Sequence, residues 1–563
     1  MKTPQKSFAN PHGRERLSRK DLIQSILKEP ELSKLITSIA RRRRKPEKEV
    51  WKKAENILEE LVTDYHPIYI SIAYRIVKWI WNRFFKQVVV DLEGLAKVKP
   101  IIKEHPVLLL PCHKSHMDYL LVSAIFYENG LTPPLVAAGV NLAFFPMGKI
   151  FRATGAYFIR RRISGDLLYA RLLAVYVRHL IKGGYTQEFF IEGGRSRTGK
   201  LVAPKHGLLF IEVEEFLVQE SGDLYAIPIA ITYDRVPEES SYITELLGKE
   251  KEKESFWSLL RSRQLLKQSF GSVFVRFGTP ISLKSYFSMN TESLATPKVR
   301  KEQTIELADK IIWSIASQSV VTVTAMAACA LLSHISENIS IQSFYENMAH
   351  LRDYLLENKF HLSHQAHEIE DHFQSVLEFL LKSGLINNKT DKSVSLRHED
   401  RIKLDYYKNT ILHFLLQPAL FVKARKSENF DKTFAFLKDI FTHEFLGVGD
   451  DLEISKENEE WLKKHPQAAQ LFFHLLDNYL EAYYVAARWA EMKMPTFPFT
   501  KERIQEALEF GRILLHKNEI CRRESLSSAN LYSALLHLHN RGMLKDHFRL
   551  KDWKNQLTEY MKL

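Results

Sequence analysis

Cysteine is scarce in this sequence. Three cysteines, Cys112, Cys329 and Cys521, are spread over 563 residues. An odd number at such wide spacing argues against a disulfide framework and against a CxxC-type metal site. Without a disulfide pattern the sequence gives no reason to place the protein in an oxidising compartment, and we therefore expect a reducing one.

Long uninterrupted apolar runs are also missing. The first forty residues contain no apolar core long enough for a secretory signal. A membrane span needs about 20 predominantly apolar residues, and the apolar stretch 67–90 is interrupted by Arg75, Lys78, Arg83 and Lys86. We therefore expect an interfacial amphipathic helix, and a helix buried against the rest of the domain is the alternative. The residues expected to share its apolar face are Ile72, Ile76, Trp79, Ile80 and Phe84.

A second uncharged stretch, residues 311–335, also falls short of a membrane span. It contains several Ser, Thr and Gln residues and one histidine. These polar side chains favour a buried helix.

Positive charge is abundant and unevenly distributed. The formal net charge is +13, and residues 1–50 hold 14 Lys/Arg against 6 Asp/Glu. This basic segment indicates an anionic partner, which could be nucleic acid, acidic lipid headgroups or an acidic carrier protein. For residues 41–45, RRRRK, a solvated tail without a partner is an equally good interpretation.

The pattern of apolar residues divides the chain into three parts. Residues 1–90 are predicted to be helical and basic, with the amphipathic segment at their end. Strands and helices alternate over 91–290, which predicts an α/β domain with a mainly parallel sheet flanked by helices. Residues 291–563 are predicted to form a helical domain, and the sequence shows no internal repeat. The expected strands are 88–92, 107–110, 135–138, 189–191, 225–231 and 273–277. The expected helices include 166–181, 207–219, 301–332, 341–356, 365–381 and 467–492.

The most informative stretch is residues 112–119, CHKSHMDY, which lies between a proline-bounded apolar strand and an apolar helix. If His113 lies in the turn and Asp118 in the first helical turn, the carboxylate can bind one imidazole nitrogen and leave the other free to take a proton. A metal site formed by His113, His116 and Asp118 lacks a fourth ligand at a recognisable spacing. A Cys112 nucleophile is poorly placed, because neighbours in a strand point to opposite faces.

Two further blocks supply cations at the ends of apolar runs. Residues 155–162, GAYFIRRR, bring Arg160 to the end of a strand-like run, although three arginines there are more often a solvated edge. Residues 189–200, FFIEGGRSRTGK, place two glycines before three cations and a serine, a composition that suits phosphate binding without the Walker spacing. The charged stretch 248–255 between strands is expected to be a solvated loop.

A fourth block surrounds Pro228 in the apolar run AIPIAITYDR. Proline inside such a run predicts a strand edge or a bulge. An ordinary core strand is the better interpretation from the residues alone, and the wall of an apolar ligand groove is the alternative.

Together the four blocks resemble those of the glycerolipid acyltransferases, specifically the bacterial glycerol-3-phosphate acyltransferases and the related dihydroxyacetone-phosphate acyltransferases. The family's HxxxxD motif corresponds to residues 113–118, its GxxFxRR block to 155–161 and its FxEGxRSR block to 190–197. The proline block surrounds Pro228. Four blocks in the family's order make the resemblance specific, and the version EGGRSR is more similar to the glycerol-phosphate branch than to the lysophosphatidate branch.

The resemblance implies transfer of a fatty acyl group from acyl-CoA or acyl-carrier protein to the sn-1 hydroxyl of glycerol 3-phosphate, which yields lysophosphatidate. It implies that His113 is the general base and Asp118 its orienting partner. It also implies that Arg160, Arg195 and Arg197 bind the phosphate, and that Glu192, Gly193 and Ser196 shape that pocket. Pro228 belongs to a block with an acyl-donor or structural role. No metal or organic cofactor is expected.

Two alternatives remain open at this point. The same chemistry could act on dihydroxyacetone phosphate, or the chain could be a basic scaffold that binds membrane or nucleic acid without catalysis. Under the main hypothesis the expected partners are the two substrates and an anionic membrane surface, with no nucleic acid. The expected location is the cytoplasmic face of a membrane, as a peripheral or monotopic protein, and the inner membrane in a bacterium.

Overall fold

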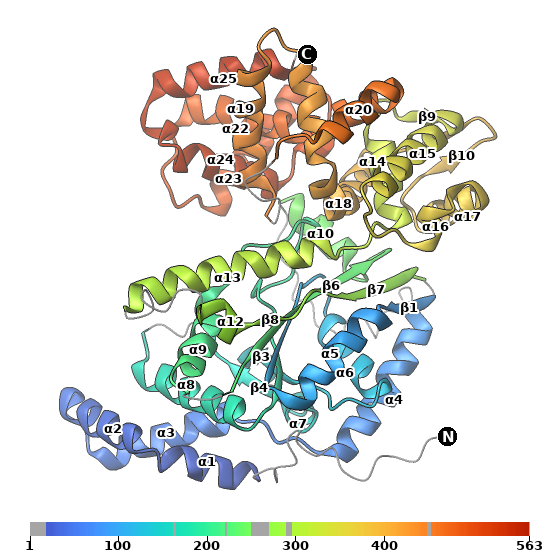
Figure 1. The fold of residues 1–563 in the computed structure, drawn as a ribbon. Coiled ribbons are helices and arrows are strands. Elements are labelled where there is room, and N and C mark those ends of the chain that lie inside the picture. Colours follow the sequence, from blue (N-terminus) through green and yellow to red (C-terminus); the bar gives the residue numbers. More distant parts are fainter. Residues whose placement is uncertain are drawn as a thin grey trace.

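The computed structural model of this chain describes residues 18–161, 165–219, 222–248, 269–288, 296–446 and 452–561. Arg162 and most of the charged connector predicted at 248–255 lie outside these residues. A sheet covered by helices forms the lower part of the molecule in Figure 1, and the helical half of the chain lies above it.

The centre of the lower part is an eight-stranded sheet with the order β1-β7-β6-β2-β5-β3-β4 and with β8 paired to β6. Five neighbouring strands, from β6 to β4, run parallel to one another. Within this sheet, as far as the described residues show it, only the pairs of β6 with β7 and with β8 are antiparallel. The mainly parallel α/β sheet predicted from the alternation is therefore confirmed. The strands are β1 Gln87–Val90, β2 Val107–Pro111, β3 Leu135–Gly139, β4 Ala156–Ile159, β5 Thr186–Glu188, β6 Tyr225–Tyr233, β7 Ser272–Phe277 and β8 Ile281–Ser282.

Helices cover the sheet, so its central strands are buried on both sides. All five residues of β2 are buried, as expected for a parallel strand between helical layers. Helices α8, α9 and α13 pack together, whereas α4 packs on α6 (Figure 1). The helices of this part are α5 Leu92–Glu104, α6 Asp118–Glu128, α7 Met147–Ala153, α8 Leu167–Lys182, α9 His206–Leu217, α10 Glu239–Leu246, α12 Leu283–Ser288 and α13 Pro297–Ser317. Helix α13 begins after the predicted boundary at 290 and still packs on β6.

Four N-terminal helices precede the sheet: α1 Arg19–Leu27, α2 Pro30–Arg43, α3 Glu47–Leu61 and α4 Pro67–Phe84. The first three pack on α8. Helix α4 has two apolar faces: Ile72, Ile76 and Trp79 are exposed as predicted, but Ile80 and Phe84 are buried. The prediction that all five share one face is therefore wrong, because the helix also packs against the domain. No described helix has the length and apolar character needed to cross a membrane.

The helical half is arranged around the long helix α18, which contacts α14, α19 and α21. Its helices are α14 Val323–Leu332, α15 Ile341–Glu357, α16 His364–His367, α17 Ile369–Lys382, α18 His398–Arg425, α19 Phe430–Glu444, α20 Lys456–Lys464, α21 Pro466–His474, α22 Asp477–Lys493, α23 Lys501–His516, α24 Ser528–Asn540 and α25 His547–Met561. A small sheet of β9 Asn338–Ser340, β10 Asn388–Lys389 and β11 Ser393–Ser395 was not predicted. The single helices predicted at 301–332, 365–381 and 467–492 are each divided into two, at residues 318–322, 368 and 475–476.

Two strand predictions need correction. The strand predicted at 189–191 lies at Thr186–Glu188, where it pairs with Val107–Leu109. Its polar sequence TQE conceals a fully buried strand, whereas the apolar residues that follow form the loop around His113. Pro228 is not at a sheet edge, because β6 lies between β2 on one side and β7 and β8 on the other. The ordinary core strand that the residues favoured is therefore confirmed. β7 pairs with residues 229–233 and β8 with residues 225–226, so Pro228 occupies the gap between them, where no partner strand needs its missing N–H.

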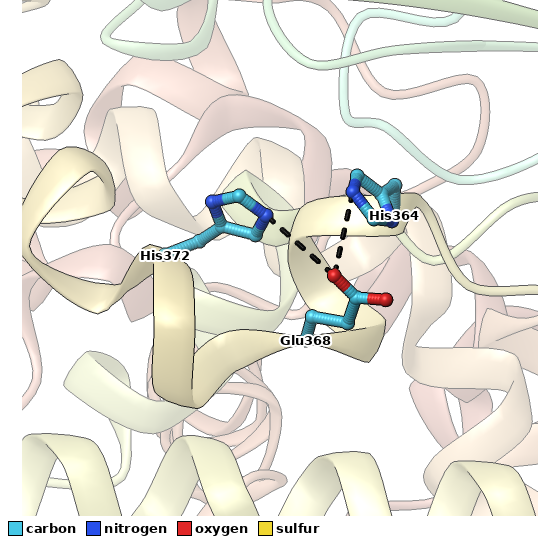
Figure 2. Close-up of side chains that lie close together, drawn as sticks. All are labelled: His364, Glu368 and His372. Atoms are coloured by element: carbon cyan, nitrogen blue, oxygen red, sulfur yellow. Dashed lines mark ion pairs between the residues drawn. The ribbon is translucent and has the colours of Figure 1, made fainter.

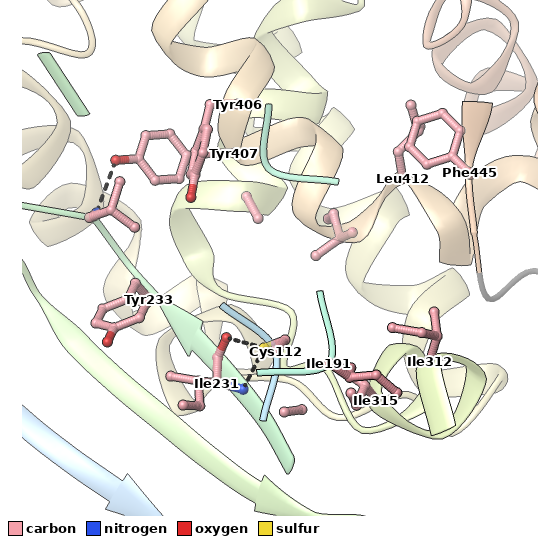
Figure 3. Packing of buried hydrophobic residues seen from close by; sticks show 14 of the residues in the cluster. Cys112, Ile191, Ile231, Tyr233, Ile312, Ile315, Tyr406, Tyr407, Leu412 and Phe445 are labelled. Carbon is pink, nitrogen blue, oxygen red and sulfur yellow. Dashed lines mark hydrogen bonds between the residues drawn. The ribbon is translucent and has the colours of Figure 1, made fainter. Parts of the chain in front are cut away.

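One hydrophobic core runs through both halves of the molecule. Figure 3 shows the junction, where Ile231 and Tyr233 of β6 face Tyr406, Tyr407 and other side chains of the helical half. Continuous burial of apolar surface across the junction stabilises the contact between the two halves. The helical half is therefore packed directly on the strand that borders β2.

Candidate active site

His113 and Asp118 meet at the turn between β2 and α6. The His113 Nδ1 atom lies 2.9 Å from Asp118 Oδ2. Because a carboxylate only accepts hydrogen bonds, Nδ1 carries the proton and donates a hydrogen bond to Asp118. The other imidazole nitrogen, Nε2, is then the acceptor, as proton abstraction requires.

Asp118 is fully buried and held by several donors. The same Oδ2 atom accepts the backbone N–H groups of Lys114 at 2.7 Å and Ser115 at 2.9 Å. Oδ1 accepts the hydroxyl of Tyr233 at the end of β6. These bonds fix the carboxylate, and the carboxylate fixes the ring of His113.

The surroundings of His113 favour a neutral imidazole. Burial lowers the pKa of His113 below its ordinary value, although the Asp118 carboxylate opposes that shift. The Phe190 ring stacks on the imidazole with centroids 4.0 Å apart. A neutral, oriented imidazole can act as a general base at neutral pH.

The segment after β5 holds His113 through the backbone. Glu192 Oε1 accepts the His113 N–H at 2.7 Å, and Oε2 accepts the Val202 N–H at 2.7 Å. The Ser196 N–H donates to the His113 carbonyl at 2.9 Å. Burial raises the pKa of Glu192 to about 7. Neither Glu192 nor Ser196 lines the cavity described below, whereas Gly193 does.

Arg195 and Arg197 extend from this segment toward helix α10. Arg195 Nη1 donates to the Tyr242 hydroxyl at 3.0 Å, and it lies 3.6 Å from Glu238 Oε1. Arg197 lies over the Tyr242 ring and 3.4 Å from Glu245 Oε1. Both guanidinium groups are therefore positioned by the same short helix.

Arg160 follows β4 and is held by an N-terminal helix. Its Nε and Nη2 atoms donate to both carboxylate oxygens of Glu60 on α3, at 2.9 and 2.8 Å. The guanidinium also lies over the Tyr169 ring. This bidentate pair fixes the orientation of the cation.

A cavity of about 1220 Å³ connects these groups. A typical small-molecule pocket measures roughly 300–1000 Å³, so this cavity has room for two substrates. His113 lines it, and so do two chemically different sets of residues. The cationic set is Arg160, Arg161, Arg195, Arg197 and Lys205, and the apolar set includes Ile70, Val77, Leu120, Ala124, Val136 and Ala137.

The remaining candidates do not join this arrangement. Pro228 is buried in β6 and does not line the cavity. The Cys112 thiol is buried against Ile231 of β6 (Figure 3), and burial raises its pKa to about 12. A thiol that stays protonated at neutral pH is a poor nucleophile.

Among the described residues, one group has side chains placed as metal ligands could be: His364, Glu368 and His372, at the junction of α16 and α17 (Figure 2). The two histidine Nε2 atoms lie 3.4 and 3.9 Å from the same Glu368 oxygen, which are ion-pair distances. The His364 side chain is 70% exposed. None of the three lines the cavity that contains His113, and His113, His116 and Asp118 form no such group in the described part.

Four residues that hold the site were not predicted: Glu60, Tyr233, Glu238 and Tyr242. Glu60 gives no signal in the sequence, because its partner Arg160 is 100 residues away. Tyr233 and Glu238 come at or just after the end of a strand predicted to lie in the same parallel sheet. Since sites in such sheets lie at the carboxyl ends of the strands, that position could have identified them.

Comparison with known proteins gives two family matches. Residues 89–232 match the family described as acyltransferase, and residues 242–469 match the family described as glycerol-3-phosphate acyltransferase C-terminal region. The first match includes the turn with His113 and Asp118, both arginine blocks and β6 up to residue 232. The second begins at Tyr242 and extends through α18 and α19.

Curated relatives carry the name glycerol-3-phosphate acyltransferase. The chain is 32% identical to the protein from Shewanella loihica, over 77% of this chain and 56% of that protein. It is 31% identical to the protein from Pseudoalteromonas translucida, over 72% of this chain and 51% of the relative. It is 32% identical to the protein from Actinobacillus succinogenes, over 72% and 50%. The chain thus spans about half the length of the curated relatives it matches.

A solved structure, the 1-acyl-sn-glycerophosphate acyltransferase PlsC from Thermotoga maritima, is 17% identical and covers 52% of this chain and 96% of that one, with a TM-score of 0.27. So low a TM-score supports no conclusion about this chain.

Proposed function

This chain belongs to the glycerol-3-phosphate acyltransferase family of HxxxxD acyltransferases, and on that premise we propose that it transfers a fatty acyl group to the sn-1 hydroxyl of glycerol 3-phosphate. The observation that carries the proposal is the His113–Asp118 pair, which opens on a cavity with both a cationic and an apolar set of residues. The product is lysophosphatidate, and the donor is acyl-CoA or acyl-carrier protein.

The proposed reaction uses His113 as a general base. Nε2 takes the proton of the acceptor hydroxyl while its oxygen attacks the carbonyl carbon of the thioester, so that a C–O bond forms. The tetrahedral intermediate then expels the thiolate as the C–S bond breaks, and the imidazolium returns the proton to sulfur. Asp118 stabilises the imidazolium between these steps. The proposed sequence of steps uses no metal and no organic cofactor.

The cationic residues of the cavity would bind the acceptor's phosphate. Guanidinium groups suit this role because they donate two parallel hydrogen bonds to neighbouring phosphate oxygens. Arg195 and Arg197 flank Ser196, whose N–H is bonded to the His113 carbonyl. A phosphate held there keeps the acceptor hydroxyl within reach of the base and replaces a random encounter by positioning. Glu192 and Ser196 would support this pocket from behind through the backbone.

The apolar residues of the cavity would hold the acyl chain next to a membrane surface. Ile70 and Val77 on the inner face of α4 line the cavity. On its outer face Trp79 is 63% exposed, and Phe145, just before helix α7, which packs on α4, is 78% exposed. Exposed apolar side chains with Arg75 and Lys149 beside them suit the surface of an anionic bilayer. We propose that the protein acts on the cytoplasmic face of such a membrane.

One experiment tests the proposal and its alternatives. The purified full chain is offered glycerol 3-phosphate or dihydroxyacetone phosphate, each with acyl-CoA or acyl-carrier protein, and the product is identified by mass spectrometry. We expect acylation of glycerol 3-phosphate, and loss of activity in His113→Ala. The exposed His367→Ala serves as the matched control. Preferential acylation of dihydroxyacetone phosphate would replace the acceptor, and salt-sensitive nucleic-acid binding without any acyl transfer would overturn the proposal.

A further inference from the structure

Residues 196–200 form a turn that contacts the catalytic turn directly. The Ser196 N–H donates to the His113 carbonyl at 2.9 Å. Lys114, the residue after His113, donates its ammonium to the Gly199 carbonyl at 2.8 Å. The Ser196 hydroxyl donates to the Lys200 carbonyl and closes the turn on itself. The backbone of this turn therefore determines where His113 lies.

The opposite side of the same turn is fixed by the helical half. Asn409 of α18 donates its amide to the Thr198 carbonyl at 2.9 Å. The Lys200 ammonium pairs with Glu444 at the end of α19. Gly199 has a φ of +84°, and a Cβ there would lie 1.9 Å from the Tyr406 carbonyl oxygen. The turn is thus pressed against α18 at a position that only glycine can occupy.

The pair of Lys200 and Glu444 is buried and well supported. Tyr483 donates its hydroxyl to the second Glu444 oxygen at 2.8 Å. The Lys200 ammonium lies 4.3 Å from the Tyr479 ring centroid and 4.9 Å from that of Phe445. Burial would raise the pKa of Glu444, but the Lys200 ammonium holds it below its ordinary value, so Glu444 is a carboxylate. A buried pair of this kind adds little net stability, because the cost of removing two charges from water offsets much of their attraction.

Helix α10 connects the arginines to the helical half in the same way. Tyr242, which contacts Arg195 and Arg197, also donates to the Lys114 carbonyl at 2.8 Å. Ser528 of α24 donates to the Glu245 carbonyl in α10 at 3.1 Å. The base and the cations therefore share supports that come from the helical half.

We propose that the helical half positions the active site, with Lys200 and Glu444 as the principal joint: Glu444 and Asn409 hold residues 196–200, which in turn hold His113 and the flanking arginines. Lys200, Glu444 and Asn409 are positioning residues, since none of them lines the cavity. The inference rests on the proposed acyl transfer for its kinetic consequence only. Its structural part concerns the turn itself and is measurable without activity.

Three variants of the full chain test the joint: Lys200→Met, Glu444→Gln and the double variant. Each single variant leaves one buried charge without its ionic partner and is expected to lose stability, whereas the double variant removes both charges and recovers part of that stability. If the pair positions the turn, kcat for acyl transfer falls roughly tenfold to 100-fold in all three variants, because a displacement of about 1 Å at a reacting group has an effect of that size. The KM for glycerol 3-phosphate rises, and the KM for the acyl donor stays unchanged.

Lys423→Met is the matched control. Lys423 is likewise buried, lies 2.7 Å from a carboxylate oxygen of Asp477 and 3.9 Å from the Phe473 ring centroid. It belongs to the helical half and has no contact with residues 196–200 among its hydrogen bonds and ion pairs. We expect this variant to lose stability and to keep the wild-type kcat in the folded fraction.

Hydrogen exchange of the peptide that spans 193–202 supplies the second readout. Its amides are expected to exchange at least about fivefold faster in the three joint variants than in the wild type or in Lys423→Met, since local opening depends on the bonds that hold a segment. Recovery of kcat together with stability in the double variant, or unchanged exchange of this peptide, would overturn the inference. If the wild type acylates neither acceptor, the proposed function fails while the exchange data still decide the structural part.

Discussion

Asp118→Asn removes the charge beside His113 while keeping the shape of the side chain. The amide oxygen of asparagine can occupy the position of Oδ2, where it accepts the N–H groups of His113, Lys114 and Ser115. The amide nitrogen then faces the Tyr233 hydroxyl at the position of Oδ1. The substitution therefore tests the carboxylate charge and not the presence of hydrogen bonds.

The size of the effect follows from the geometry. His113 Nδ1 lies 2.9 Å from the carboxylate oxygen, and Asp118 is fully buried. Two unit charges about 4 Å apart interact by roughly 4 kcal/mol at an effective dielectric constant of about 20. Because the imidazolium is only partly formed in the transition state, we expect a loss of about 2.7–4 kcal/mol, which lowers kcat by roughly 100- to 1000-fold. Asp118 does not line the cavity, so the KM for the acceptor changes little.

The pH dependence supplies a second, independent test. A general base must be neutral, so activity falls as the pH drops through the pKa of His113. Burial places that pKa below the ordinary value of about 6.5, and the Asp118 carboxylate raises it. Loss of the charge therefore moves the acid limb of kcat/KM to lower pH. Release of free thiol from the donor, followed by a colour reaction, measures the rate across the pH range.

Tyr233→Phe is the matched comparison, since it removes one hydrogen bond to Asp118 and keeps the charge. A hydrogen bond to a charged group contributes about 1.5–3 kcal/mol. Because this bond is present in both the ground state and the transition state, only part of that energy affects the rate, and kcat is expected to fall by roughly threefold to tenfold. A kcat of Asp118→Asn within threefold of wild type, in protein with a native circular dichroism spectrum, would refute the assigned role. A shift of the acid limb to higher pH would do the same.

Three further outcomes are expected. Arg195→Ala is expected to raise the KM for glycerol 3-phosphate by about 10- to 100-fold, because hydrogen bonds to a charged group contribute roughly 1.5–3 kcal/mol. Initial rates measured against acceptor concentration give this KM. An unchanged KM would contradict the role of Arg195 in phosphate binding. The double variant Ile72→Glu/Trp79→Glu is expected to co-sediment less with anionic liposomes. Its thermal stability is expected to stay unchanged, because both side chains are exposed. Undiminished liposome binding would show that α4 does not contact the membrane. Gly199→Ala is expected to lower the free energy of unfolding, measured by urea denaturation, by about 1–3 kcal/mol. The φ of Gly199 is positive and the Tyr406 carbonyl leaves no room for a Cβ. Wild-type stability of this variant would show that the turn can move away from α18.

Several features were predictable because they depend on neighbours in the sequence. The strand predicted at 107–110 is β2, which is one residue longer, and the expected apolar helix after the turn is α6. His113 lies in the turn and Asp118 begins the helix, the arrangement in which a hydrogen bond between them was expected. The expected strand-like run before Arg160 is β4. Such elements were predictable because apolar periodicity and turn residues act over a few positions of the chain.

Other features were hidden because packing overrode local sequence. Thr186–Glu188 carries polar residues but lies between β2 and β3, so its burial comes from neighbours that are distant in sequence. Ile80 and Phe84 carry the same apolar signal as Ile72 and Trp79, yet only contact with the domain decides which of them are buried. Pro228 is tolerated in a central strand because β7 and β8 leave a gap beside it, and no local pattern reveals that gap.

The sequence by itself determined the chemistry of this protein: a histidine and an aspartate within one turn, arginines at strand ends, and the α/β architecture that brings those ends together. The tertiary structure alone decided how that chemistry is held. Tyr233 is 115 residues from Asp118, Glu60 is 100 residues from Arg160, and Glu444 is 244 residues from Lys200. Contacts at such separations form only when long loops close and apolar surfaces meet, and a single sequence carries no spacing that identifies the partners. The HxxxxD turn is therefore a local property of the chain, whereas its rigid placement belongs to the whole fold.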